Sequence, residues 1–201
     1  MGQYYLAYVR REGKKPAVFS NYCEDEENGK CLMEHSWWLN GVVGNVVNDL
    51  FYNRAHVCWV GDYYYNDDHR QVNCSKDKVK EIGDYTWGEK TKRKPTTHAN
   101  VRYLTNCLIV NHTKKLYIDC DKYYERSKFK AEYEDQTFFQ CIHPLPLLTC
   151  SANHSGGSYG GTCEESCGTW FNDEIEVVLS WEEGALRRKG YTELEVKFKE
   201  E

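Results

Sequence analysis

The stretch SWWLNGVVGNVVNDLFY, residues 36–52, decides the fold because it is the clearest helix in the chain. Its apolar residues recur at helical spacing and form one continuous stripe, which consists of Leu39, Val42, Val43, Val46, Val47 and Leu50. Ser36 is suited to the N-cap position. The opposite face is polar and carries Asn45, Asn48 and Asp49. Because valine is an indifferent helix former, we expect this helix to gain its stability by packing on a sheet.

Strand patterns flank the helix on both sides. Ahead of it, residues 3–10 and 17–20 are rich in tyrosine, valine and phenylalanine, and a turn containing Gly13 and Pro16 joins them. These features predict an N-terminal hairpin. Behind the helix, residues 56–60 predict a buried strand that ends at the following glycine.

The second half of the chain continues this pattern. Residues 102–110 and 115–119 predict a hairpin around a short polar turn. Residues 174–181 and 192–198 alternate charged and apolar side chains and predict another hairpin. Residues 123–134 are charged and predict a helix.

Together these elements predict a single domain, residues 1–201, of the α+β class: a mainly antiparallel sheet with one main amphipathic helix, about 36–52, packed on it. Residues 66–100 are polar and mixed, and they predict an insertion or mobile arm with a short helix at 76–82. The basic run Lys90–Lys94 within it is either a solvated loop or a contact for an acidic partner.

Composition excludes several classes of protein. The net charge of −5 argues against general nucleic-acid binding, because no basic excess is available to neutralise phosphates. No run of about 18 apolar residues occurs, so no membrane-spanning helix is expected. The start, MGQYYLAYVRR, lacks the basic and apolar regions of a signal peptide, which predicts a cytoplasmic protein. Its ten cysteines are then expected to be thiols or metal ligands.

Four cysteines gather between residues 141 and 167, in a stretch rich in glycine. Cys163 and Cys167 have a spacing that suits half of a structural zinc site, and Cys141 and Cys150 would complete it. His143 or His154 are alternative ligands. The competing interpretation is four independent buried thiols, because free cysteine is among the most buried residue types.

The glycines of this stretch suggest a binding loop. Asn153, Gly156, Gly157 and Tyr159 are candidate ligand-binding residues, because glycine lets the backbone approach a ligand and successive N–H groups can hold an anion. The alternative is a connecting loop packed by its own tyrosine.

Polar residues at the ends of predicted elements are further candidates for ligand binding. Glu34 and His35 precede the main helix, Asp62 follows a strand, and His143 precedes a proline. Such side chains perform acid–base chemistry where they converge. Glu34 and His35 have a simpler role available, since a carboxylate is favourable near a helix N-terminus.

Five segments, in order along the chain, resemble a family of small bacteriophage and prophage proteins. They are MGQYY (1–5), LMEHSW (32–37), VCWVGDYY (57–64), VNHTKKLYID (110–119) and HPLPLLT (143–149). The family has no assigned activity, so the resemblance implies a setting, which is the cytosol of an infected bacterium.

We expect a phage-encoded, non-enzymatic binding protein. This expectation rests on the setting, the acidic charge, the sixteen tyrosines and the lack of a catalytic signature. Its expected partner is a host bacterial protein, such as an antiviral defence component that it inhibits, or a small anionic nucleotide that it sequesters. One alternative is a small nucleotide-processing enzyme with His35, Asp62 and His143 in one cleft. Another is a zinc-stabilised structural or assembly protein.

Overall fold

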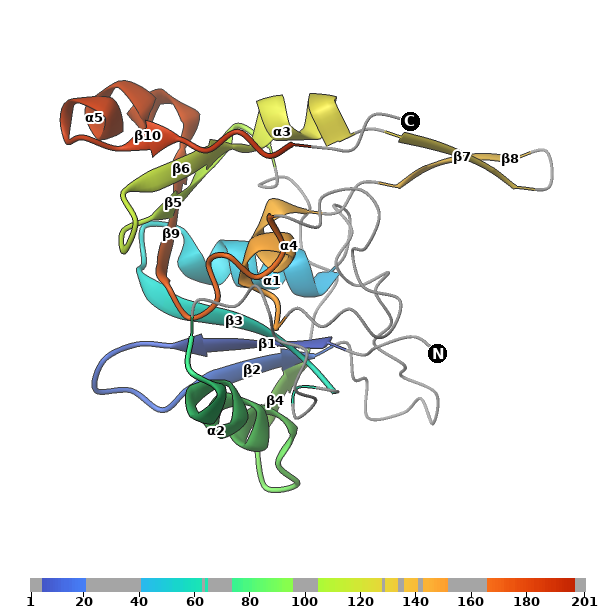
Figure 1. Cartoon of the computed structure of the whole chain (residues 1–201), viewed down its shortest axis with the longest axis vertical. Helices are drawn as coiled ribbons and strands as arrows, with labels where there is room; N and C mark the ends of the chain where they lie inside the picture. Colours follow the sequence, from blue (N-terminus) through green and yellow to red (C-terminus); the bar gives the residue numbers. More distant parts are fainter. Residues whose placement is uncertain are drawn as a thin grey trace.

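In a computed structural model, the chain is built on an eight-stranded sheet with helices on both of its faces (Figure 1). The structure describes residues 5–20, 41–62, 64, 74–95, 105–127, 129–133, 136–140, 143–151 and 166–197. The sheet strands are β1 (Tyr5–Arg10), β2 (Ala17–Ser20), β3 (Ala55–Gly61), β4 (Arg93–Pro95), β5 (Cys107–Asn111), β6 (Leu116–Asp119), β9 (Glu174–Leu179) and β10 (Thr192–Glu193). The helices are α1 (Gly41–Leu50), α2 (Lys76–Trp87), α3 (Cys120–Ser127), α4 (Pro144–Thr149), the 3-10 turn η4 (Ser180–Glu182) and α5 (Glu183–Arg188).

The sheet is mainly antiparallel, with strand order β10-β6-β5-β9-β3-β1-β2-β4. Its neighbouring strands are antiparallel except at the two edges, where β10 joins β6 and β4 joins β2 in parallel. This arrangement confirms the predicted α+β class. No helix among the described residues is long and apolar enough to cross a membrane.

One face of the sheet carries the main core, and α1 packs there as its sequence predicts. The described part of the apolar stripe is fully buried and comprises Val42, Val43, Val46, Val47 and Leu50. Helices α3 and α4 contribute to the same core (Figure 1). Residues 36–40, which the sequence assigns to this helix, lie outside the described residues.

The other face holds two smaller cores under separate helices. Because side chains alternate along β1, Leu6 and Tyr8 point to this face. There they pack against Val79 and Ile82 of α2. Further along the sheet, Leu186 of α5 packs on β5, β6 and β9. Within the range predicted as an insertion or arm, residues 74–95 thus form α2 and β4 in the body of the domain.

Helix α4 lies in the stretch that the sequence analysis treats as an irregular loop. Its two prolines occupy N1 and N3, where a helix has no intrahelical partner for an N–H group. The N–H between them, on Leu145, donates to the His143 ring (N···N 3.2 Å). The first helical bond runs from Leu147 N–H to His143 O (3.3 Å). A short helix is therefore compatible with both prolines.

One predicted hairpin is wrong, and one predicted helix is shorter than expected. The strands predicted at 174–181 and 192–198 do not form a hairpin, because β9 lies between β5 and β3 while β10 pairs with β6. The helix predicted over 123–134 ends at Ser127, and the chain continues into a separate two-stranded sheet. That sheet, β7 (Phe129–Tyr133) and β8 (Gln136–Gln140), projects from the body in Figure 1.

Candidate functional site

Segments far apart in the sequence meet where β3 ends. The register pairs Tyr5, the first residue of β1, with Gly61, the last residue of β3. Cys150 forms a parallel bridge with Trp59, so the chain leaves α4 alongside the same strand. We call the group of Tyr5, Asp62, Cys150, Ser151 and Cys167 the β3-end cluster.

Main-chain hydrogen bonds fix both sides of this cluster. Ser151 N–H donates to Trp59 O (2.8 Å), and Gly61 N–H donates to the Ser151 hydroxyl (2.9 Å). On the other side, Gly168 N–H donates to Leu147 O (3.0 Å). Residues 152–165, which contain the glycine-rich stretch, are therefore preceded by backbone bonded to β3 and followed by backbone bonded to α4.

Burial keeps the Tyr5 hydroxyl and the Cys150 thiol of the cluster in their neutral forms. Burial raises the pKa of Tyr5 well above its usual range, and nearby Cys150, Cys167 and Asp62 act in the same direction. Burial also raises the pKa of the Cys150 thiol, as does its hydrogen bond with Cys167. Asp62 is only partly buried and supplies the carboxylate of the cluster.

His143 lies at the far end of α4 from Cys150, roughly 10 Å away along a helix axis that rises about 1.5 Å per residue. It is completely buried, and burial lowers its pKa to about 3. Because Nδ1 accepts from Leu145 N–H, the proton of the neutral ring is on Nε2. His143 thus acts as the N-cap of α4, a role that the sequence analysis does not assign to it.

The structure brings together only part of the predicted site. Asp62, Cys150 and Cys167 converge around Tyr5, and His143 stands apart from them. The remaining candidates lie outside the described residues, and these are Glu34, His35, Cys141, Asn153, Gly156, Gly157, Tyr159 and Cys163. No group of three or more metal-ligating side chains occurs among the residues that the structure describes. The zinc prediction therefore stays a prediction.

The segment VNHTKKLYID, by contrast, lies away from the cluster and is held by its own contacts. Asn111 donates to Asp173 (2.7 Å), and the Lys114 ammonium contacts the same carboxylate. His112 lies between the Tyr191 hydroxyl (2.8 Å) and the Glu176 carboxylate (2.9 Å). These groups tie the β5–β6 turn to the start of β9.

The basic run lines an open hollow of about 730 Å³ between the β1–β2 turn and the loop after α2. Lys15, Lys90 and Lys92 border it together with Tyr85, and none of the three lysines has an ion pair among the described residues. Tyr5 is the first residue of β1 and Lys15 lies beyond the other end of this strand, so the hollow is separate from the β3-end cluster.

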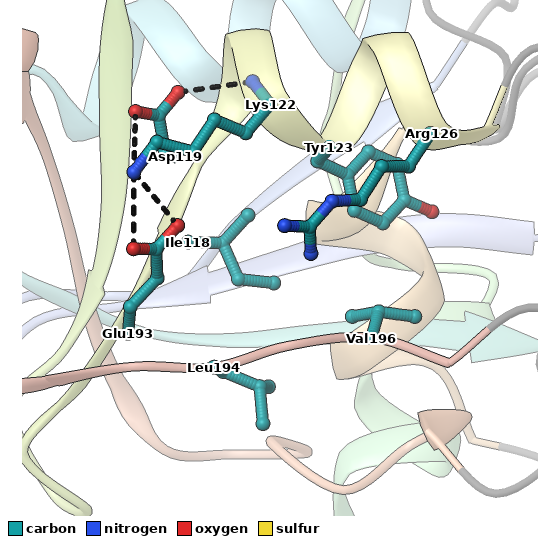
Figure 2. A pocket seen from close by; sticks show the side chains of 8 residues that line it. All are labelled: Ile118, Asp119, Lys122, Tyr123, Arg126, Glu193, Leu194 and Val196. Atoms are coloured by element: carbon teal, nitrogen blue, oxygen red, sulfur yellow. Dashed lines mark hydrogen bonds and ion pairs between the residues drawn. The ribbon is translucent and has the colours of Figure 1, made fainter.

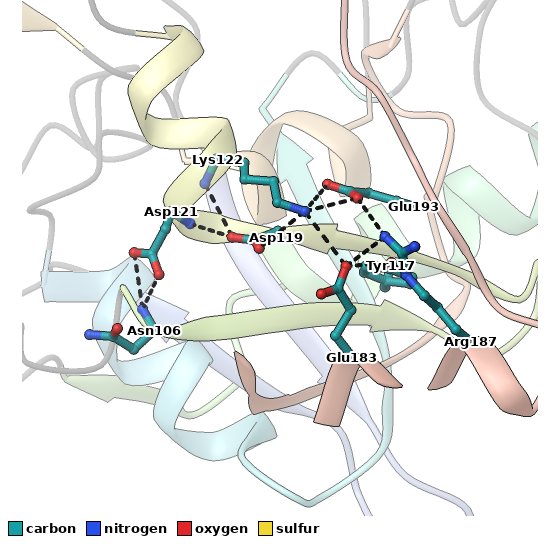
Figure 3. Close-up of polar contacts among 8 residues, drawn as sticks. All are labelled: Asn106, Tyr117, Asp119, Asp121, Lys122, Glu183, Arg187 and Glu193. Carbon is teal, nitrogen blue, oxygen red and sulfur yellow. Dashed lines mark hydrogen bonds and ion pairs between the residues drawn. The ribbon is translucent and has the colours of Figure 1, made fainter. Parts of the chain in front are cut away.

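A charged cluster joins α3, α5 and β10. The Lys122 ammonium lies 3.0 Å from Glu193 and 3.6 Å from both Asp119 and Glu183 (Figure 3). The hollow beside it, shown in Figure 2, has a volume of about 10 Å³. Such a space holds at most one water molecule. The cluster therefore binds the C-terminal segment to the sheet and is not a ligand site.

Sequence reasoning missed two members of the β3-end cluster, Tyr5 and Ser151. Neither has a distinctive residue type or spacing. Tyr5 is the last residue of the segment MGQYY, and Ser151 is two residues beyond the end of HPLPLLT. Both residues lie in or next to the segments that resemble the phage family. The sequence alone does not show that these segments meet in space.

Comparisons of the chain with protein-family models, with curated proteins and with solved structures find no match.

Proposed function

We propose that the chain is a phage-encoded, non-enzymatic binding protein that acts on its bacterial host through the β3-end cluster. One observation carries the proposal: the partly exposed carboxylate of Asp62 lies near Tyr5, and both Tyr5 and Cys150 are held in their neutral forms by burial. A nucleophile needs a lowered pKa, and burial raises the pKa of both Cys150 and Tyr5. These groups favour binding over catalysis.

The chemistry of the cluster also constrains the partner. Asp62 accepts hydrogen bonds and repels anions, so it suits a donor such as a guanidinium, an ammonium or the N–H edge of a nucleobase. A host protein supplies the first two groups and a nucleotide supplies the third. In a nucleotide complex, the phosphates would lie away from Asp62.

The test compares wild type with Asp62→Asn, which removes the charge and keeps the shape. Asp77→Asn on the exposed first turn of α2 is the matched control. Each tagged protein is passed through lysate of the bacterial host. Captured proteins are identified by mass spectrometry, and small molecules are released by heat and analysed by liquid chromatography–mass spectrometry.

We expect wild type and Asp77→Asn to retain the same partner or nucleotide, and Asp62→Asn to lose most of it. Equal capture by all three proteins would contradict the role of the cluster. The anti-defence setting has its own test. If phage lacking the gene grow normally on hosts that carry defence systems, the proposal of defence inhibition fails.

A zinc-stabilised protein is a second candidate, favoured by the contact between Cys150 and Cys167. Two of the four predicted ligands are thereby in hydrogen-bond contact. Zinc would deprotonate both thiols and replace the bond from Cys150 to Leu147 O (3.2 Å). Elemental analysis of the purified chain decides this, with one zinc per chain expected for wild type and loss of zinc for Cys167→Ser. Metal-free wild type would end the candidate.

A further inference from the structure

Two cysteines outside the β3-end cluster lie opposite each other: Cys107 begins β5, and Cys120, the first residue of α3, directly follows β6. The β5–β6 register pairs Leu108 with Asp119 and Ile109 with Ile118. One step further along the same antiparallel ladder, Cys107 falls opposite Cys120. Both side chains are completely buried in the main core, and their thiols are in hydrogen-bond contact.

The separation of these two residues suits a disulfide. The carbonyl oxygens of Lys115 and Tyr117 accept from the β10 segment, so the alternate residues of β6 direct their backbone groups to β5. Cys120, the first residue of α3, follows directly after β6 and continues the alternate residues that face β5. Hydrogen-bonded antiparallel partners have Cα atoms about 5.5 Å apart. Disulfides span Cα separations of about 4.4–6.8 Å, with the commonest values near 5.5–6 Å.

We propose that Cys107 and Cys120 form a disulfide site, oxidised by exchange with a small-molecule disulfide of the glutathione class. One protein thiolate attacks a sulfur of the reagent, forms a mixed disulfide and releases the first small thiol. The second protein thiol then attacks the mixed disulfide, forms the Cys107–Cys120 bond and releases the second small thiol. Two electrons pass from the protein pair to the reagent, and the two thiol protons end on the released thiols.

Burial decides when this exchange takes place. The hydrogen bond from Cys107, together with burial, raises the pKa of the Cys120 thiol well above its usual range. Since the thiolate is the reacting form, the folded pair reacts only when this end of the hairpin opens. The bond therefore forms during folding or slow opening, and once formed it is protected from reductants.

The test follows the bond in the full-length chain. Reduced protein is unfolded in guanidinium chloride and refolded in glutathione buffers that range from fully reduced to mostly oxidised glutathione. A second sample stays folded in the same buffers. Both are quenched with acid, alkylated under denaturing conditions, digested and mapped by mass spectrometry.

We expect a linked Cys107–Cys120 peptide at the oxidising end, first in the refolded sample. Oxidised wild type should melt roughly 5–10 °C above the reduced protein. Cys107→Ala should lose this difference, whereas Cys58→Ala, which changes another completely buried cysteine, should keep it.

The proposal is overturned if both cysteines are alkylated in every sample, or if Cys107 is found linked to a different cysteine. The peptide map of wild type decides even if Cys107→Ala does not fold. Because Asp62 takes no part, this result is independent of the proposed binding function.

Discussion

Tyr52, just beyond the end of α1, has a backbone conformation that bulky residues rarely adopt. Its φ is +48°, and its side chain is 53% exposed. The N–H group donates to Val177 O (2.9 Å), which fixes this conformation against β9. Glycine is favoured at such a position after a helix because it has no Cβ to crowd the backbone.

Tyr52→Gly is therefore expected to stabilise the protein by about 0.5–1 kcal/mol, because strain is relieved and little buried area is lost. Urea unfolding measures the change. Tyr52→Ala is the control, since it removes the ring and keeps a Cβ at positive φ. If both variants lose the same stability, the ring contact with Phe51 outweighs the strain.

Individual site residues were predictable only in part. Asp62 was predictable because the strand before it is evident from the sequence, and polar residues at strand ends are candidates for ligand binding. The role of His143 as an N-cap was not predictable, because it depends on residues 144–149 forming a helix. Tyr5 becomes part of the site through its pairing with Gly61, which is a contact between residues far apart in the chain.

At the scale of elements, the contact between β3 and the segment after α4 holds the candidate site together. Ser151 is completely buried, and its hydroxyl is the acceptor for Gly61 N–H. Ser151→Ala leaves that N–H unsatisfied, which is expected to cost about 1–3 kcal/mol. Urea unfolding gives the loss, and hydrogen exchange should show a faster amide at Gly61.

The matched control is Ser166→Ala, on the other side of residues 152–165. The main-chain carbonyl oxygen of Ser166 accepts hydrogen bonds from the Thr169 N–H (3.3 Å) and the Thr169 hydroxyl (2.9 Å). Replacing the Ser166 side chain leaves this oxygen in place. The change should therefore leave stability within about 0.5 kcal/mol of wild type. Equal losses from the two variants would mean that the Ser151 hydroxyl has no special role.

The charged cluster shown in Figure 3 is expected to hold α5 to β6 through one hydroxyl. Tyr117 is completely buried, donates to Glu183 (2.9 Å) and accepts from Arg187 (2.9 Å). Tyr117→Phe removes both bonds and should lower the unfolding free energy by about 1–2 kcal/mol. Tyr85→Phe, which alters an exposed tyrosine, serves as the control in the same unfolding assay. A loss no larger than that of the control would contradict the role of the cluster.

Elements were predictable where the signal is local. The apolar stripe of α1 and the apolar and aromatic runs of β1, β2 and β3 are set by residues a few positions apart, and the structure has these elements. Pairing is not local. After β9 the chain forms α5, and β10 then pairs with β6 and not with β9. The alternating sequence of β10 does not indicate which strand it pairs with. Helix α4 was missed because the glycines of the surrounding stretch suggested a loop. The two prolines of α4 occupy positions that need no N–H.

At the scale of the whole molecule, the sheet is covered on both faces, and imidazoles are buried at two separate places. His143 is inside the main core. His112 lies near the smaller core under α5, where burial lowers its pKa and the Arg54 charge adds to the effect. Both are therefore held neutral in the folded chain, so their protonation is coupled to unfolding.

This coupling predicts loss of stability in mild acid. An unfolded histidine has a pKa of about 6.5, so below that pH the unfolded chain binds protons that the folded chain does not. Stability is complete above about pH 6.5 and falls as the pH drops. His143, with a folded pKa of about 3, alone should cost about 2 kcal/mol between pH 7 and 5. His112 adds to this loss, whereas a buried carboxylate with a lowered pKa contributes mainly below pH 5.

Urea unfolding at half-unit steps from pH 7.5 to 5 measures the slope. His112→Gln keeps groups that can hydrogen-bond to Tyr191 and Glu176 but cannot titrate, so its slope should be shallower than that of wild type. His143→Asn keeps an acceptor for Leu145 N–H and should reduce the slope further, whatever its effect on absolute stability. A wild-type stability that stays flat from pH 7.5 to 5 would mean that both imidazoles accept a proton without unfolding, and would contradict their burial as neutral groups.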